Sequence, residues 1–178
     1  MWWREESVAN IRLLIADDHG VVRAGLRALL NSQPDMEVCA EAADGQQAVA
    51  QSAKTAPDIV LLDLKMPGVG GFEALRLIKA QSPTVKVLVL SMYDDESYLM
   101  KVLEAGASGY VLKRAADVEL LSAIRSVYEG GVYVDPSLSR LMVKGFLSAK
   151  PNGAKAADGK AEEPALSERQ RQVLRLLA

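Results

Sequence analysis

Short apolar runs alternate with stretches of helical periodicity between residues 10 and 130. Most of these runs are rich in Val, Ile and Leu and show no regular polar position, which is typical of strands whose two faces are both buried. Their lengths are those of ordinary strands. The pattern predicts five strands, at Ile11–Ala16, Glu37–Ala42, Ile59–Leu62, Val85–Leu90 and Gly109–Leu112.

The stretches between the strands carry apolar residues at the i, i+4, i+7 and i+8 spacing of a helix with one buried face. This spacing is clearest after the first strand (Val22, Leu26, Leu29, Leu30) and after the fifth (Leu120, Ile124, Val127, Tyr128). Strands that alternate with helices indicate an α/β fold with a parallel sheet. For five right-handed units we expect the flavodoxin-like doubly wound sheet, in strand order 2-1-3-4-5, with a ligand crevice at the carboxyl ends of its strands.

The pattern changes after Gly131. Asp135 is a good N-cap and Pro136 suits the first helical position, so a sixth helix is expected, with Leu138, Leu141, Met142 and Phe146 on one face. The stretch 149–165 is rich in Ala, Gly, Lys and Pro and has no large apolar residue, which is typical of a flexible linker.

A second amphipathic helix is expected at the end of the chain. Ser167 and Gln170 form a capping box, and Val173, Leu174 and Leu177 follow on one face. The chain therefore divides into an N-terminal extension (1–9), an α/β domain (10–134), a helix with a flexible linker (135–165) and the start of an all-α domain (166–178).

Composition agrees with a globular protein of the cytoplasm. The 178 residues are 49% hydrophobic and 25% charged, and no apolar run approaches the roughly 18 residues that span a bilayer. The N-terminus lacks the features of a secretory signal, and the single Cys39 cannot form an internal disulfide. The formal net charge of −2 gives no overall positive field, so contact with DNA would need a local feature.

Polar side chains follow four of the predicted strands, at the point where each strand ends. They are Asp17 and Asp18 after the first strand, Asp63 after the third, Ser91 after the fourth and Lys113 after the fifth. Because the carboxyl ends of parallel strands meet at one edge of the sheet, these groups should share one crevice. A shared crevice explains why the buried strand Ile59–Leu62 is followed directly by the carboxylate of Asp63.

Three carboxylates in one crevice favour a bound cation. They would raise one another's pKa unless a divalent ion compensated their charge, and hard oxygen ligands suit Mg²⁺. A carboxylate beside Mg²⁺ can attack phosphorus to give an aspartyl phosphate, whose oxygens an ammonium and a hydroxyl would stabilise. No base is placed at these strand ends to activate water, so the acyl phosphate should persist, as a signal requires.

Four motifs, IADDH, VLLDLKMPG, VLVLSMYDD and GASGYVLK, resemble the receiver domain of two-component response regulators at the same spacings. The set is most similar to the NarL/FixJ (LuxR-type) family, over residues 10–134. The terminal LSERQRQVLRLLA resembles the opening of the helix-turn-helix domain of that family, and would end within the first helix of that domain.

The resemblance implies a role for each of these residues. Asp63 would be the phosphoacceptor, Asp17 and Asp18 the acidic pair at Mg²⁺, the Lys65 backbone carbonyl a further metal ligand, Ser91 and Tyr110 the switch pair, and Lys113 the phosphate partner. The implied partners are a sensor histidine kinase and, after phosphorylation, a second copy of the chain. DNA would be bound only through a complete helix-turn-helix, so no DNA-binding residue and no membrane contact are expected in this chain.

The sequence disfavours two other functions. A Mg²⁺-dependent aspartyl-phosphate phosphatase would favour a second acid two residues after the nucleophile, where this chain has Lys65. A flavodoxin-like nucleotide or flavin binder is disfavoured because the acidic loop after the first strand would repel a phosphate group. His19, beside the acidic pair, is interpreted as a solvated surface residue and is left out of the site.

Overall fold

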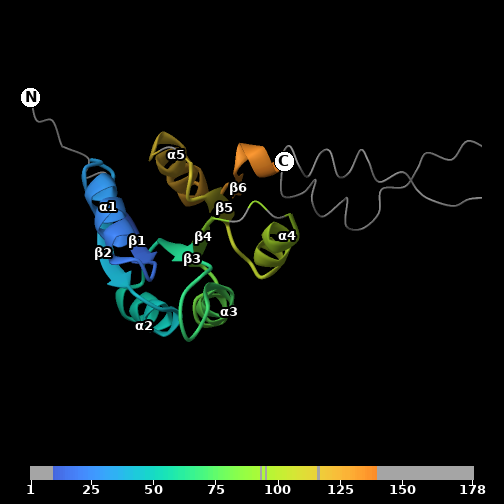
Figure 1. Ribbon diagram of the computed structural model, residues 1–178. Helices are drawn as coiled ribbons and strands as arrows, with labels where there is room; N and C mark the ends of the chain where they lie inside the picture. The colour runs from blue at the N-terminus through green and yellow to red at the C-terminus, as the bar shows by residue number, and fades with distance from the viewer. Residues whose placement is uncertain (1–9, 93, 95, 116, 140–178) are drawn as a thin grey trace, which may run out of the picture.

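A six-stranded parallel sheet forms the centre of the molecule in the computed structural model, which describes residues 10–139 except 93, 95 and 116 (Figure 1). The strands lie in the order β2-β1-β3-β4-β5-β6. Their bounds are β1 Ile11–Ala16, β2 Met36–Ala42, β3 Ile59–Asp63, β4 Lys86–Ser91, β5 Gly109–Leu112 and β6 Tyr133–Val134. All neighbouring strands are parallel, so their carboxyl ends share one edge.

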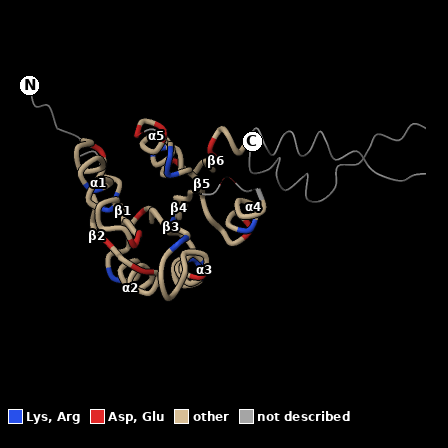
Figure 2. Tube along the Cα trace, in the orientation of Figure 1, with Lys and Arg blue, Asp and Glu red and all other residues tan. Residues whose placement is uncertain are grey.

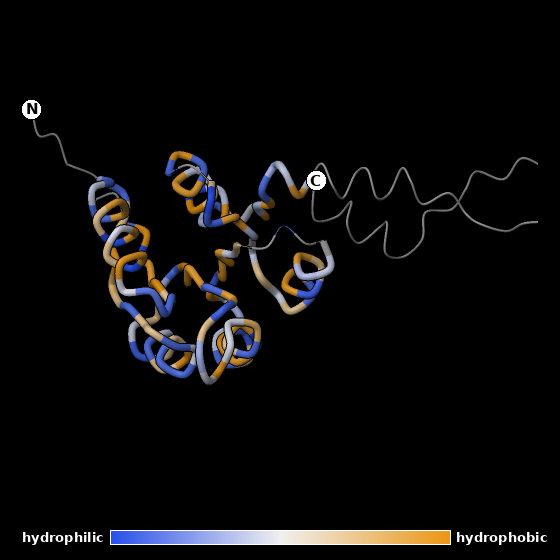
Figure 3. The backbone as a smooth tube through the Cα atoms, in the orientation of Figure 1, coloured by the Kyte–Doolittle hydropathy of each residue, from blue (hydrophilic) through white to orange (hydrophobic). Residues whose placement is uncertain are grey.

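Helices cover both faces of the sheet. Helices α1 (Gly20–Asn31) and α5 (Asp117–Tyr128) pack on one face. Helices α2 (Gly45–Thr55), α3 (Gly71–Gln81) and α4 (Glu96–Glu104) pack on the other. Figure 3 shows hydrophobic positions along the strands, and hydrophobic and hydrophilic positions that alternate along each helix. The sheet therefore separates two apolar cores, and every crossover helix buries one face against it.

The predicted flavodoxin-like sheet in the order 2-1-3-4-5 is confirmed, with two corrections. The structure adds β6, which pairs parallel to β5 and which the sequence pattern did not predict. Two strands also end one residue later than predicted, so that Asp63 and Ser91 are the last residues of β3 and β4 rather than the first residues after them. A two-residue strand has no periodicity that could identify it.

The predicted helix start after β6 is present. The Asp135 carboxylate accepts hydrogen bonds from the Ser137 backbone N–H (3.0 Å) and hydroxyl (2.6 Å), and residues 136–139 are helical. Leu138 is fully buried in the core between the sheet and the helices α2, α3 and α4. The rest of this predicted helix, the linker, the terminal helix and the N-terminal extension lie outside the described residues.

Gly109→Ala should destabilise the edge of the sheet that carries β6. A Cβ at this position would lie 2.7 Å from both the Tyr133 carbonyl oxygen and Leu88 Cδ1. Either β6 or the core must then shift, at a cost of about 1–3 kcal/mol in the free energy of unfolding, measured by urea denaturation. Gly25→Ala is the matched control, because nothing lies within 4 Å of a Cβ there and an exposed helix favours Ala by roughly 0.5–1 kcal/mol. An unchanged midpoint for Gly109→Ala would contradict the close packing of β5 and β6.

Charged residues are distributed over both helical layers (Figure 2). In the part of the chain that the structure describes, no helix is both long enough and apolar enough to cross a bilayer.

Candidate functional site

Asp17, Asp63 and Lys113 meet at the carboxyl edge of the sheet. The Lys113 Nζ lies 2.7 Å from Asp17 Oδ2 and 2.7 Å from Asp63 Oδ2, and so bridges the two carboxylates. The Asp17 and Asp63 side chains are almost fully buried, and that of Lys113 is 15% exposed. Lys113 is 96 positions from Asp17 and 50 positions from Asp63 along the chain, and only the parallel arrangement of β1, β3 and β5 brings the three residues together.

The backbone around Asp63 is held by a close turn. The Lys65 backbone N–H donates to Asp63 Oδ1 at 3.1 Å, and the Gly71 N–H donates to the Leu64 carbonyl oxygen at 3.1 Å. A Cβ on Gly71 would lie 2.0 Å from the Asp63 carbonyl oxygen, so this approach of α3 to the end of β3 requires glycine. Gly68, with a φ of 69°, makes the turn between them. These contacts hold the Asp63 carboxylate in the crevice, against Lys113 Nζ.

Charge pairing outweighs burial at this site. Burial raises the pKa of Asp17, but the hydrogen bond from Lys113, the His19 backbone N–H and the Lys113 charge together hold that pKa below its ordinary value. Burial likewise lowers the pKa of Lys113, yet its hydrogen bonds to Asp17 and Asp63 raise that pKa above its ordinary value. Asp17 and Lys113 are therefore both charged near neutral pH.

Asp18 and His19 complete the acidic rim. The His19 Nδ1 lies 2.8 Å from Asp18 Oδ1 and 3.1 Å from Asp17 Oδ1, and the His19 backbone N–H donates to Asp17 Oδ1 at 2.8 Å. The side chain of His19 is 65% exposed, as expected for a surface residue, but it contacts both acids of the pair. The sequence interpretation of His19 as a solvated residue missed these contacts, which the Asp-Asp-His order alone does not specify.

The residues at this edge fit a divalent metal ion. One ligand atom from each of Asp17, Asp18, His19 and Asp63 can lie within 4.8 Å of the others. Three carboxylates and the Lys113 ammonium leave two uncompensated negative charges, and the donors from the aspartates are the hard oxygens that Mg²⁺ prefers. The rim carboxylate of Asp18 is partly exposed, which leaves room for the waters that Mg²⁺ usually retains.

Ser91 and Tyr110 are both buried, but in different places. Ser91 ends β4, and its carbonyl oxygen accepts the Lys113 backbone N–H at 2.8 Å, so it lies beside the crevice. Tyr110 lies in the middle of β5 with none of its surface exposed, packed in the same core as Leu138. The structure therefore places Ser91 at the strand ends with the acids and places Tyr110 deeper in the sheet.

Arg23 is a contact of the site that sequence reasoning did not identify. Its Nη1 donates to the Asp17 backbone carbonyl oxygen at 2.7 Å, and its Nε lies 3.5 Å from Glu41 Oε2. Arg23 thereby fastens the first turn of α1 to the loop that carries the acidic pair. The signal available in the sequence was an arginine one turn into a helix that begins beside two acids.

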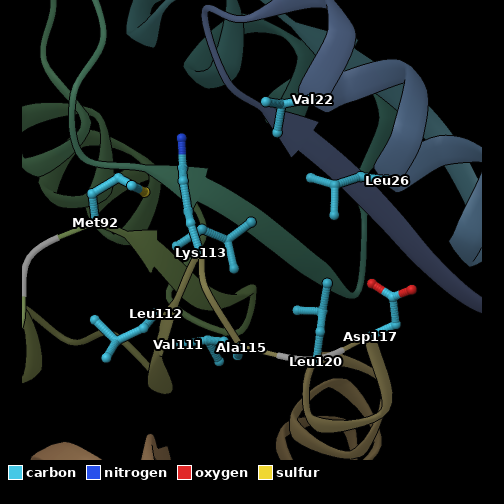
Figure 4. A pocket seen from close by; sticks show the side chains of 10 residues that line it. Val22, Leu26, Met92, Val111, Leu112, Lys113, Ala115, Asp117 and Leu120 are labelled. Atoms are coloured by element: carbon cyan, nitrogen blue, oxygen red, sulfur yellow. The ribbon is translucent and has the colours of Figure 1, made fainter.

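An apolar pocket of about 270 Å³ opens next to the crevice (Figure 4). Val22 and Leu26 of α1 lie opposite Leu120 of α5, and the Lys113 side chain extends between them and Met92. Val22, Met92 and the neighbouring Val21 are exposed, Val21 to 88%. An exposed apolar surface therefore adjoins a charged crevice and shares Lys113 with it.

Comparison with known families identifies one family over most of the chain. A family model described as the response regulator receiver domain matches residues 13–125. Two oxygen regulatory proteins NreC are similar along almost the whole sequence. That of Staphylococcus haemolyticus is 44% identical over 94% of this chain and 77% of the relative, and that of Staphylococcus aureus strain MRSA252 is 45% identical with the same coverage.

Solved structures show the same fold. A two-component response regulator of the LuxR family from Aurantimonas is 36% identical, with a TM-score of 0.76 over 79% of this chain and 100% of that one. The isolated REC domain of RcsB from Salmonella enterica, solved with the phosphomimetic BeF₃⁻, is 30% identical, with a TM-score of 0.69 over 74% of this chain and 98% of that one.

Proposed function

Because this chain belongs to the response regulator receiver family, and within it to the LuxR (NarL) type, we propose that its signal is a phosphoryl group carried on Asp63. The observation that carries the proposal is the position of Lys113 Nζ, 2.7 Å from the Asp63 carboxylate and 2.7 Å from Asp17. An ammonium held there can neutralise the charge that develops on a phosphoryl group at Asp63. Intact mass after incubation with a small acyl phosphate tests the assignment.

The transfer is a displacement at phosphorus. A carboxylate oxygen of Asp63 forms a bond to phosphorus while the bond between phosphorus and a donor nitrogen breaks, and the released imidazole takes up a proton. A phosphohistidine of a sensor histidine kinase would be such a donor. Lys113 then moves from the carboxylate oxygen to the phosphoryl oxygens, and Ser91, beside the crevice, offers a hydroxyl to them. Tyr110 would complete the switch pair from within β5.

Mg²⁺ would be held by the carboxylates of Asp17, Asp18 and Asp63 and by the Lys65 backbone carbonyl. When bound, it supplies charge neutralisation to the phosphoryl oxygens during transfer. The support for this assignment is the convergence of the aspartate oxygens at the rim of the crevice and their net negative charge. His19 offers a nitrogen at the same rim, but the oxygen donors already satisfy the preference of Mg²⁺.

The donor must contact the face that surrounds Asp63. The apolar pocket between α1 and α5 is lined in part by Lys113, which pairs with Asp63, and Val22 and Met92 of its lining are exposed to solvent. We propose that this surface binds the donor protein and leaves Asp63 open to the phosphohistidine. Burial of apolar surface would supply affinity, while the charged crevice selects the phosphoryl group.

The proposed output lies in the C-terminal part of the chain. Residues 10–134 would act as the receiver and 135–165 as a helix and flexible linker, and 166–178 would begin a helix-turn-helix domain that regulates transcription. No residue of this chain is assigned to DNA, and dimerisation on phosphorylation belongs to the same proposal. The family is one of signalling proteins, and its members and relatives give no support to the phosphatase alternative. The chain would therefore catalyse only its own phosphorylation and slow dephosphorylation, in the cytoplasm.

Mg²⁺ should stabilise the folded protein, and Asp18→Ala should remove that stabilisation. An ion that binds only the folded state adds RT ln(1 + [Mg²⁺]/Kd), or on the order of 1–3 kcal/mol at about 5–100 times Kd. Thermal denaturation with and without MgCl₂ measures the effect. Asp44→Ala is a control for a lost aspartate, since Asp44 caps α2 through the Gln47 N–H and is not among the residues whose ligand atoms converge at the rim, so its loss should lower stability equally with and without the ion. An unchanged Mg²⁺ shift in Asp18→Ala would contradict the metal assignment.

A further inference from the structure

Asp135 connects three parts of the receiver. Its backbone N–H donates to the Tyr110 carbonyl oxygen at 3.0 Å, which continues the pairing of β6 with β5. Its carboxylate Oδ1 caps the helix at 136–139 through Ser137, and its Oδ2 accepts the Leu112 backbone N–H at 3.4 Å. The residue is only 6% exposed. A single buried carboxylate therefore contacts both the last residue of β5 and the first turn of the next helix.

The contact with Leu112 takes the place of a missing sheet hydrogen bond. In a continued parallel ladder, the Leu112 N–H would donate to the Asp135 carbonyl oxygen. That oxygen instead accepts the N–H groups of Leu138 and Ser139, at 3.0 Å each, because the chain turns into a helix at Pro136. The carboxylate supplies the acceptor that the backbone has lost. At 3.4 Å this hydrogen bond is long, so a small movement of the end of β5 shortens or breaks it.

The end of β5 also carries the cation of the crevice. Leu112 directly precedes Lys113, whose Nζ bridges Asp17 and Asp63. A phosphoryl group on Asp63 places its oxygens farther from β3 than the carboxylate oxygens are, and it adds negative charge. Lys113 must change partners to follow them. The Leu112 backbone is adjacent to the residue that changes partners, and the Leu112 N–H donates to the Asp135 carboxylate.

We propose that Asp135 is a positioning residue that couples the crevice to the helix beginning at Pro136, through its hydrogen bond to Leu112 at the end of β5. This inference rests on the proposed phosphorylation of Asp63. Occupancy of the crevice draws the end of β5 onto Asp135 and tightens the first turn of the helix. Coupling between two sites is reciprocal, so loss of the Leu112 contact must also weaken binding in the crevice by the same factor.

Hydrogen exchange on the whole chain, with BeF₃⁻ and Mg²⁺ as the phosphoryl mimic, tests the coupling. In the wild type the mimic should slow exchange of the amides of Ser137, Leu138 and Ser139, all of which donate to Asp135, by about 2- to 10-fold, the range expected from one hydrogen bond. Asp135→Ser keeps a good helix cap but has a single side-chain oxygen, which cannot serve both Ser137 and Leu112. In Asp135→Ser, exchange of the amides at positions 137–139 should not change when the mimic is added. The affinity of this variant for BeF₃⁻ should fall by the same 2- to 10-fold.

Ser137→Ala is the matched control, because it removes the hydroxyl that donates to Asp135 Oδ1 and leaves the Leu112 contact in place. It should keep the response to the mimic. Asp135→Asn, which keeps the side-chain size, is measured beside Asp135→Ser in case the serine variant is poorly folded; its amide nitrogen cannot accept a hydrogen bond while its oxygen caps Ser137. An Asp135→Ser chain that responds like the wild type, or a wild type that binds BeF₃⁻ with unchanged or faster exchange, overturns the coupling. Failure of the wild type to bind BeF₃⁻ at all overturns the proposed function instead.

Discussion

Asp63→Asn should abolish phosphorylation completely. In the wild type, a small acyl phosphate with Mg²⁺ should add the mass of one phosphoryl group to the intact chain. Asp63 ends β3, between β1 and β4, and its carboxylate lies 2.7 Å from Lys113 Nζ and beside the other acids of the crevice. An amide at this position is not a nucleophile and does not carry the charge that pairs with Lys113. Intact-mass spectrometry reads the result directly.

Asp94→Asn is the control that shows whether the effect is specific to the Asp63 carboxylate. Asp94 lies beyond the end of β4 with its side chain 57% exposed, and it pairs with Arg114, whereas Lys113 pairs with Asp17 and Asp63. The control should gain the same mass as the wild type, and that mass should disappear on treatment with hydroxylamine, which cleaves acyl phosphates. A phosphoryl group of normal stoichiometry on Asp63→Asn would show that the nucleophile is a different residue.

Lys113→Met should cause the largest loss of stability among the substitutions in the crevice. The variant leaves Asp17 and Asp63, both buried, without their shared cation. Removing one partner of a buried ion pair costs about 3–5 kcal/mol, and we expect a value near 3 kcal/mol because the crevice is open on one side. Urea denaturation without Mg²⁺ measures it. Added Mg²⁺ should recover part of the loss, since a bound cation compensates the same carboxylates.

The stability lost in Lys113→Met should shrink as the pH falls. In the wild type, the pKa of Asp17 is held below its ordinary value of 3.8, so its contribution to stability is present above that value and is lost as the pH falls through the folded-state pKa. Without Lys113, burial is opposed only by the hydrogen bonds from His19, so the folded-state pKa of Asp17 should rise relative to the wild type. The variant then loses less stability than the wild type as Asp17 is protonated, and its deficit should narrow as the pH falls from neutral toward about 4.

Lys54→Met is the control for the loss of a lysine. Lys54 is exposed in the last turn of α2, away from the crevice, and its substitution should change the free energy of unfolding by less than about 1 kcal/mol at any pH in this range. A Lys113→Met deficit that is equally small, or one that grows as the pH falls, would contradict the charge balance described for the crevice.

The main features of the fold followed from local sequence patterns. The strand Ile59–Leu62 is apolar on both faces, and a run of this kind has few places except the centre of a parallel sheet, where β3 lies. The Asp135 cap was also predictable, because an acid followed directly by proline is typical of a helix start, and the hydrogen bond that forms the cap joins residues two positions apart. The pairing of β6 was not, since only tertiary contact with β5 identifies two residues as a strand.

The sequence could predict which residues share the crevice, but not which of their atoms are in contact. Asp17, Asp63 and Lys113 follow from strand order, since parallel strands must bring their carboxyl ends together. The orientation of His19 toward the acidic pair depends on the first turn of α1, which composition and spacing do not determine. Arg23 likewise bonds to a backbone oxygen, and every residue has one, so no sequence pattern identifies that partner.

The wide separation of Lys113 from Asp17 and Asp63 along the chain affects how the protein folds and opens. The crevice closes only when segments 50 and 96 residues apart have docked, and such long-range closures are slow steps in folding. The carboxylates lie at the ends of β1 and β3, two adjacent strands inside the sheet, whereas the lysine directly follows β5, whose outer neighbour is the two-residue β6. Partial unfolding from that edge would release the lysine while the central strands remain paired. The ability to accept a phosphoryl group would therefore depend on the edge of the sheet that assembles last and opens first. Mild denaturant should abolish phosphorylation before circular dichroism detects any loss of secondary structure.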